Sequence, residues 1–172
     1  PCLMDGKRTR AQLLRDEIIE ATAKLVAEHG MDFPMRILAD NLNTWPNAIY
    51  GHFPSKLLLQ EAAANYIIDD VFCSDAVSDI VAREEPWQDK FRTLARLLFD
   101  CARAHPGLGR LQTYYGVGGS SGSFNLVGTL VSLGMKQGLP ERRAAILVQS
   151  AIVYIVTLGD MAAHYDSDEA DM

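Results

Sequence analysis

Apolar residues recur along this chain every three or four positions, which is the repeat of an α-helix that buries one face. No stretch alternates strictly between apolar and polar residues, the pattern expected of a half-buried strand. Prolines and glycines divide the apolar pattern into separate segments. We therefore predict an all-α protein.

Three helices are predicted before Pro54. The first spans 9–29 and ends at Gly30, the usual left-handed residue after a helix. The second spans 34–42, and the third spans 46–52 and begins with a proline, which suits a first helical position. The apolar residues expected to face inward are Leu14, Ile18, Ala21, Leu25, Val26, Met35, Leu38, Ala39, Leu42, Ile49 and Phe53.

The rest of the chain is also predicted to be helical. Ser55 can cap a long helix over 55–76. Further helices are expected over 86–104, 108–115, 124–137 and 140–165. The segment 116–123 is rich in glycine and serine and is predicted to be a loop. The acidic end, 166–172, is predicted to be frayed.

The net charge of −6 lies in the second part of the chain. Residues 1–56 hold seven basic and seven acidic groups, whereas residues 57–172 hold nine basic and fifteen acidic groups. Within the neutral part, a short basic arm suits either phosphate contacts or a solvated tail, and it consists of Lys7, Arg8, Arg10 and Arg15. We predict one domain over 1–56 and another over 57–172, bridged by the helix over 55–76.

The three N-terminal helices, joined by tight connections, have the dimensions of a helix-turn-helix unit, whose last helix enters the major groove of DNA. Spacing alone fits a structural module without DNA contact equally well. The order and spacing of particular residues favour DNA binding: Leu38, Ala39, Leu42, Pro46, Ala48, Ile49, Tyr50, His52, Phe53 and Lys56. This run resembles the DNA-binding signature of the TetR family of transcriptional regulators.

The resemblance implies a role for several residues at DNA. Tyr50 and Lys56 would contact phosphates, although Tyr50 could instead pack between helices. Arg36 would reach the DNA backbone, and Asn47 and His52 would approach base edges, which set sequence preference. The other DNA-binding candidates are Thr44, Trp45, Lys7, Arg8 and Arg10.

Two residues depart from the family pattern. Asn43 stands where the family usually has glycine, and asparagine adopts a left-handed turn more readily than most residues. Trp45 stands where the family has a serine or threonine that caps the third helix, and tryptophan cannot cap. Either Thr44 takes over the cap, or Trp45 contributes by packing or by touching the DNA backbone.

The resemblance also implies a small-molecule cavity within the second part. The candidates to line it are Tyr66, Phe72, Phe91, Leu94, Leu98, Tyr114, Tyr115, Phe124, Tyr154 and Asp160. Each could instead fill the core, which is what aromatic and aliphatic residues at helical spacing usually do. Asp160 lies among apolar residues and needs either a partner such as His164 or a cationic effector.

The helix over 140–165 is apolar nearly all round, so a second subunit is its expected cover. The family's homodimer uses two C-terminal helices from each partner. Here a helix after residue 166 is missing, so either the chain is truncated or the helix over 124–137 supplies the second one. Gln149, Ser150, Thr157 and Asp160 interrupt the apolar run, so we expect no membrane span and a cytoplasmic protein.

No pattern points to catalysis, a metal or a cofactor. The three cysteines form no metal-binding pair, and the four histidines show no ligand spacing. The glycine-rich segment lacks the residues of a nucleotide-binding loop. We predict a sequence-specific DNA-binding regulator, a repressor released by a small-molecule effector. The alternative is a helical ligand-binding or interaction module that no longer binds operator DNA.

Overall fold

The computed structural model describes the backbone of residues 10–72, 74–115 and 121–170, and the side chains of 14–72, 75–111 and 125–166. Over these ranges the chain is helical and has no strand, which confirms the all-α prediction. The helices are α1 (Arg10–His29), α2 (Met35–Asn41), α3 (Pro46–His52), α4 (Lys56–Val71), α5 (Ser74–Ala82), α6 (Trp87–Ala104), α7 (Leu108–Tyr115), α8 (Ser121–Lys136) and α9 (Glu141–Ala170).

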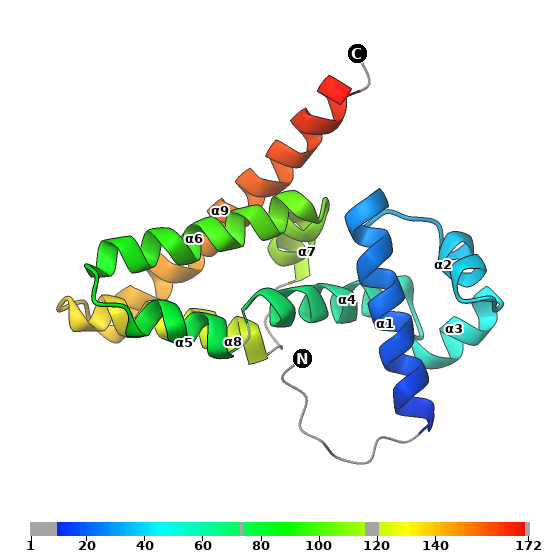
Figure 1. The fold of residues 1–172 in the computed structure, drawn as a ribbon, viewed down its shortest axis with the longest axis horizontal. Helices are drawn as coiled ribbons and strands as arrows, with labels where there is room; N and C mark the ends of the chain where they lie inside the picture. Colours follow the sequence, from blue (N-terminus) through cyan, green and yellow to red (C-terminus); the bar gives the residue numbers. More distant parts are fainter. Residues whose placement is uncertain (1–9, 73, 116–120, 171–172) are drawn as a thin grey trace.

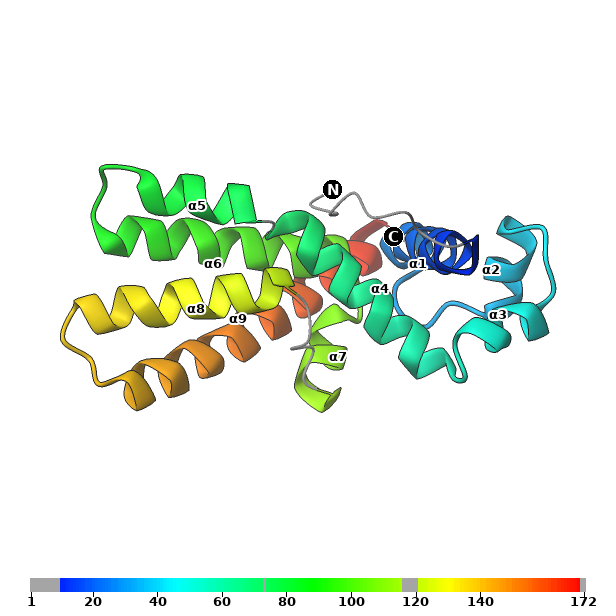
Figure 2. The same ribbon diagram turned by 90° about the horizontal axis from the view of Figure 1, so that it is seen from below.

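The molecule has two ends joined by α4. Helices α1, α2 and α3 lie at one end, and α5, α6, α8 and α9 run side by side at the other (Figures 1 and 2). Helix α4 packs against α1 on one side and against α6, α7 and α8 on the other. A displacement of α4 would therefore be felt at both ends of the molecule.

The N-terminal helices start and stop where local signals predicted. Gly30 ends α1 with a φ of 70°, a left-handed conformation that glycine adopts without strain. Pro46 is the first residue of α3, and the Ser55 hydroxyl caps α4 by accepting a hydrogen bond of 3.2 Å from the Leu58 N–H.

The core of the N-terminal end contains most of the predicted apolar residues. Leu38, Ile49 and Phe53 are fully buried there, whereas Leu14 is exposed, contrary to prediction. The connection between α1 and α2 adds Met31 and Phe33, both fully buried, which the helix pattern alone did not indicate. Met31 is held by the turn between α6 and α7 and by Gln60 of α4, and the Phe33 ring lies beside Lys56 at the start of α4.

The prediction of one long helix over 55–76 is wrong. Helix α4 stops at Val71, and Phe72 leaves the helical conformation with φ −111° and ψ 33°. Its ring is completely buried, so tertiary packing and not a glycine or proline ends the helix. Helix α5 then forms a separate element that the sequence pattern did not predict.

The C-terminal helices pack closely around α9. Helix α9 contacts α6, α7 and α8. A Cβ atom at Gly159 of α9 would lie 2.7 Å from the Cβ of Ala102 in α6, a distance shorter than any packed contact. The absence of a side chain at Gly159 therefore allows α6 and α9 to approach each other.

Helices α8 and α9 are both longer than predicted. Helix α8 begins at Ser121, before residue 124, while residues 116–120 of the predicted loop lie outside the described part. Helix α9 continues to Ala170, so the prediction of a frayed end from residue 166 is wrong. An ion pair of 2.6 Å between Arg103 Nε and Asp166 Oδ2 helps to hold this extension against α6.

By length and composition, the stretch Glu141–Asp166 of α9 is apolar enough to cross a membrane, with a mean hydropathy of 1.7 in its most apolar window. Only 28% of that window is buried within the chain. A core helix of a globular protein passes the same test of length and composition. The exposed part of α9 is therefore the feature that needs a partner.

Candidate nucleic-acid interface

A tight left-handed turn joins α2 and α3. Asn43 has a φ of 49°, as predicted for its place in the family pattern. The Thr44 N–H donates to the Ala39 carbonyl across 2.9 Å, which closes the turn. Ala39 itself is buried, so its small side chain lets the two helices approach.

Helix α3 begins without a side-chain cap. Trp45 occupies the capping position with φ −102° and ψ 146°, and no side-chain hydrogen bond caps the helix, so Thr44 does not take over this role. Trp45 is 81% exposed, which excludes packing within the chain as its contribution. Contact of Trp45 with DNA stays a prediction.

Polar side chains occupy the outer face of α3. Ile49 is fully buried, whereas Asn47 is exposed and Tyr50 is 40% exposed. The Tyr50 ring is therefore not part of the core between helices. His52, at the end of α3, is half-buried, and its backbone carbonyl accepts a hydrogen bond of 3.1 Å from Arg15.

Basic side chains lie beside these polar groups. Arg36 projects from α2 with 88% of its side chain exposed. Lys56 begins α4, with its Nζ 5.2 Å from the centre of the Phe33 ring. The Arg15 guanidinium lies 4.3 Å from the Phe53 ring, so α1 also brings a cation to this end of the molecule. Lys7 and Arg8 lie outside the described residues, as does the side chain of Arg10.

A hollow of about 670 Å³ opens between α2 and α3. We call it the α2–α3 hollow. It is lined by Arg36, Ala39, Asp40, Asn43, Thr44, Trp45 and Pro46. It therefore adjoins the outer face of α3 and contains four of the polar side chains at this end of the chain.

Those predicted effector residues whose side chains the structure describes do not converge on one cavity. Phe72, Leu94 and Leu98 are buried core residues, while Tyr66 and Tyr154 are exposed. The side chains of Tyr114, Tyr115 and Phe124 lie outside the described residues.

Phe91 lines an apolar groove of about 540 Å³ between α6, α8 and α9. The other lining residues are Trp87, Gln88, Arg92, Ala95, Leu130, Leu133, Gly134, Leu139, Ala144, Leu147 and Val148. The parts of α6, α8 and α9 that line this groove lie beyond α4, at the end of the molecule opposite to α3 (Figure 2).

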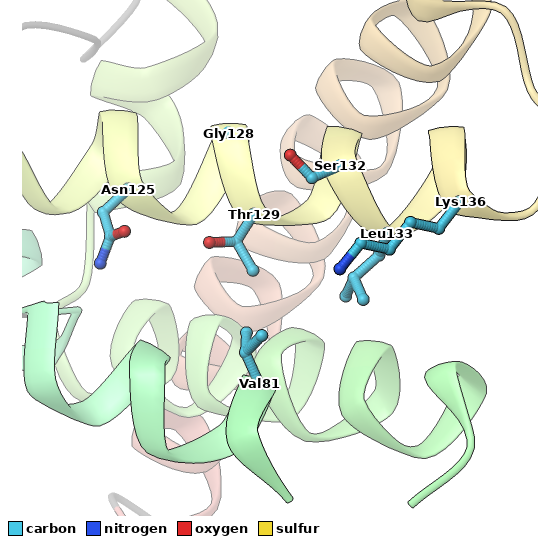
Figure 3. A pocket seen from close by; sticks show the side chains of 7 residues that line it. All are labelled: Val81, Asn125, Gly128, Thr129, Ser132, Leu133 and Lys136. Atoms are coloured by element: carbon cyan, nitrogen blue, oxygen red, sulfur yellow. The ribbon is translucent and has the colours of Figure 1, made fainter.

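A smaller, more polar hollow of about 260 Å³ lies between α5 and α8. Asn125, Thr129 and Leu133 of α8 extend toward Val81 of α5, whereas Ser132 points away (Figure 3). The amide nitrogen of Asn125 is buried and has no hydrogen-bond partner. Because Leu133 lines both this hollow and the apolar groove, the two spaces are neighbours.

Asp160 has a backbone partner that the sequence did not suggest. Its carboxylate accepts a hydrogen bond from the N–H of Gly107, in the turn between α6 and α7. The same turn contacts the N-terminal end, because the Met31 N–H donates to the Pro106 carbonyl across 2.8 Å. The side chain of Gln60 in α4 donates to the Met31 carbonyl across 2.5 Å.

Helix α9 carries a second apolar face that the chain leaves uncovered. Apart from Ile146, its exposed large apolar side chains follow a repeat of three, four and seven positions and thus lie along one side of the helix: Leu147, Tyr154, Leu158, Met161 and Tyr165. We call this row the α9 seam. It lies away from the buried residues of α9 that pack in the bundle, Ala144, Val148, Ile152, Val156 and Ala163.

The described titratable groups show no constellation typical of catalysis. No group of three or more His, Cys, Asp or Glu residues in the described ranges is arranged to hold a metal ion. Cys101 is buried in the bundle, and this burial, with a smaller effect of Asp70, raises the pKa of its thiol to about 12. Such a thiol is a poor nucleophile at neutral pH.

Comparison with known proteins agrees with this geometry. Residues 18–63 match the model of the family described as "Bacterial regulatory proteins, tetR family". Nucleoid occlusion factor SlmA of Aliivibrio fischeri (strain MJ11) is 31% identical over 101 residues, which cover 58% of this chain and 50% of that protein. The aligned part of the chain thus spans half the length of this curated relative.

Two solved structures show the same fold. A TetR variant from Acinetobacter baumannii AYE in complex with minocycline has a TM-score of 0.72 at 22% identity, over 91% of this chain and 85% of that one. BioQ with its double-stranded DNA operator has a TM-score of 0.71 at 22% identity, over 87% of each chain.

Proposed function

This chain belongs to the TetR family of DNA-binding transcriptional regulators, and from this premise we propose that it is a homodimeric repressor that a small molecule releases from operator DNA. The observation that carries the proposal is the outer face of α3. There, Asn47 and Tyr50 are exposed above a buried Ile49, beside the exposed cation Arg36. A short helix with such a face can enter a major groove about 12 Å wide.

We assign two kinds of contact to this interface. Tyr50, Lys56 and Arg36, with the arm residues Lys7, Arg8 and Arg10, bind phosphates and set affinity and register. Asn47 and His52 approach base edges, because they lie on and at the end of the helix that enters the groove. The acidic remainder of the chain stays away from the duplex, because it lies at the other end of the molecule.

The α9 seam supports a homodimer. An exposed row of large apolar side chains marks a protein interface in a globular chain, and the row continues over most of α9. Helix α8 packs beside α9 and so provides the second helix of each partner. A dimer brings two α3 helices to half-sites about 34 Å apart, one turn of the duplex.

We place the effector in the apolar groove lined by Phe91. The groove touches the start of α6, and the other end of α6 leads into the turn that contacts Met31. We infer that α6 takes one position in the DNA-binding state and another in the released state. An effector that binds one of these states more tightly than the other would shift the equilibrium between them. In the neighbouring hollow, the Asn125 amide is placed to bind a polar group of the same effector.

The domain boundary follows from this division of roles. We assign DNA binding to residues 1–56 and effector binding and dimerisation to 57–172. Helix α4 contacts elements of both parts and connects them mechanically. No part of the proposal requires catalysis, and we assign none.

Selection from a pool of random 30-base-pair duplexes tests the proposal. We expect the chain to enrich a palindromic sequence and to bind it with an affinity that falls steeply with salt, because phosphate contacts release counterions. Asn47→Ala should weaken discrimination between selected and random duplexes, whereas Lys56→Ala should weaken both complexes together. If no duplex sequence is enriched, or if the affinity for the enriched duplex does not change with salt, the result would favour an interaction module without operator binding.

A second candidate function comes from the curated relatives. The relative from Aliivibrio fischeri that matches 58% of this chain is a nucleoid occlusion factor, SlmA. Mapping of bound fragments across the chromosome distinguishes the two roles. A regulator of neighbouring genes should occupy few promoter sites, whereas a nucleoid occlusion factor should occupy many sites spread along the chromosome.

A further inference from the structure

Trp45, which is 81% exposed, and Arg36, whose side chain is 88% exposed, both line the α2–α3 hollow. A tryptophan left in water is costly, because a buried aromatic side chain removes roughly 150–250 Å² from solvent. Trp45 neither caps α3 nor packs in the core. The indole is therefore free to contact a partner outside the chain.

We propose that the α2–α3 hollow seats one nucleotide of the DNA backbone, with Arg36 paired to its phosphate and the Trp45 indole packed against its deoxyribose. The inference rests on the proposed function and adds to it a site and the chemistry that the site recognises. The ligand is a sugar-phosphate unit of duplex DNA, bound without regard to the identity of its base.

Arg36 is the group of the hollow that suits a phosphate. Arg36 Nε lies 3.9 Å from Asp40 Oδ2, which is too long for a hydrogen bond, and both side chains are largely exposed. Such a surface pair contributes little, so Arg36 can exchange the carboxylate for a phosphate at small cost. Asp40 also lines the hollow and should repel the same phosphate.

The hollow is continuous with the proposed interface. It is lined by Trp45 and Pro46 at the start of α3, and Asn47 and Tyr50 follow on the outer face of that helix. When α3 lies in the major groove, the preceding helix α2 crosses the DNA backbone, so the hollow between the two helices lies beside a DNA strand. Thr44 and Asn43 add polar side chains to the wall of the same hollow.

Salt dependence separates the two contacts. A phosphate contact contributes about 0.9 to the slope of log affinity against log salt, whereas an apolar contact with a sugar contributes nothing to it. Arg36→Ala should therefore lower affinity and reduce the slope by about one. Trp45→Ala should lower affinity by about tenfold and leave the slope unchanged. Asp40→Asn should raise affinity.

The experiment uses the full chain and a duplex selected by the wild-type protein from a random pool. Titrations at several salt concentrations give the affinity and slope of each variant. In a Trp87→Phe background, Trp45 is the single tryptophan, so its emission should shift when the duplex binds. Ile146→Ala, which removes another exposed apolar side chain on α9 outside both the apolar groove and the α9 seam, is the matched control and should bind as the wild type does.

The outcomes distinguish this inference from the proposed function. If the wild type selects no duplex, the proposed function fails. If it binds a duplex while Trp45→Ala retains full affinity and the Trp45 emission is unchanged, the inference alone fails. A smaller slope of log affinity against log salt for Trp45→Ala would also overturn the inference, because Trp45 would then support phosphate contacts and not a contact with the sugar. The circular dichroism of each variant checks that it is folded.

Discussion

The backbone N–H of Met31 donates a hydrogen bond of 2.8 Å to the carbonyl oxygen of Pro106. This contact joins the connection after α1 to the turn between α6 and α7. On its other side, the Met31 carbonyl accepts from Gln60 of α4. One buried residue thus connects the DNA-binding end, the bridging helix and the bundle, and we expect effector-driven movement of α6 to reach α1 and α4 through it.

The first prediction concerns Gly107, next to this contact. Its φ is +94°, and a Cβ there would lie 2.7 Å from the Cβ of Met31. We expect Gly107→Ala to lower the free energy of unfolding by about 3 kcal/mol, from backbone strain and steric overlap together. Urea denaturation at fixed protein concentration measures the loss.

Gly138→Ala is the matched control for this change. Gly138 has a φ of +87°, but no atom lies within 4 Å of its Cβ position. Only the cost of a left-handed conformation remains, about 1–2 kcal/mol. Equal losses in the two variants would contradict the steric part of the argument and with it the tight packing at Met31.

The second prediction concerns Asp160, whose carboxylate accepts the Gly107 N–H. Asp160→Ala leaves this buried N–H without a partner, and we expect it to lower the free energy of unfolding by about 1–3 kcal/mol. Asp160→Asn keeps an acceptor oxygen and should lose less, because only the charge of the acceptor is removed. If both variants were equally destabilised, the hydrogen bond would not be the cause.

These contacts mark the limit of what the sequence could predict. Gly30, Pro46 and Ser55 are local signals, and the helices beside them begin or end as predicted. The end of α4 depends on the burial of Phe72, which is a property of the whole fold and leaves no local mark. Asp160 and Gly107 are far apart in the chain, so their hydrogen bond could not be inferred from spacing.

The candidate DNA interface was predictable in part for a similar reason. A family resemblance indicates which positions meet DNA, and the exposure of Asn47 and Tyr50 agrees with it. The resemblance could not assign Trp45, because the family usually has a smaller residue there. Its exposure and its place in the α2–α3 hollow became visible only in three dimensions.

The third prediction tests the close approach of α6 and α9. At Gly159, a Cβ would lie 2.7 Å from the Ala102 Cβ and equally close to the Phe99 carbonyl oxygen. Since the helix backbones must separate to make room, Gly159→Ala should lower the free energy of unfolding by about 2–3 kcal/mol. Differential scanning calorimetry should show a lower melting temperature.

Gly128→Ala in α8 provides the opposite case. Its Cβ would meet nothing within 4 Å, and alanine favours a helix over glycine by about 1 kcal/mol. We therefore expect this variant to be more stable than the wild type. A destabilised Gly128→Ala would mean that the space beside α8 is filled in the folded protein, for example by a partner subunit.

The fourth prediction concerns the reactivity of Cys101. Burial raises the pKa of its thiol to about 12, so the thiolate, which is the reactive form, is scarce at pH 8. In a chain with Cys2 and Cys73 changed to serine, iodoacetamide should leave the folded protein unmodified and alkylate it fully in urea. Rapid modification without denaturant, detected by mass spectrometry, would show that the bundle opens.

The fifth prediction tests the α9 seam as the dimer interface. Tyr154 is 66% exposed in the protomer and lies in the middle of the seam. Tyr154→Glu should leave the fold of the protomer intact, but a dimer would bury two carboxylates without partners, which costs several kcal/mol. Analytical ultracentrifugation should therefore give the mass of one 19.0 kDa chain for this variant and twice that mass for the wild type.

Gln149→Glu is the control for charge alone. Gln149 is exposed on α9 but lies off the seam, so its variant should remain dimeric and bind the selected duplex as the wild type does. Monomeric Tyr154→Glu should bind this duplex far more weakly, because a single α3 reads only one half-site. A Tyr154→Glu chain that still sediments as a dimer would place the interface elsewhere and leave the apolar surface of α9 to another partner.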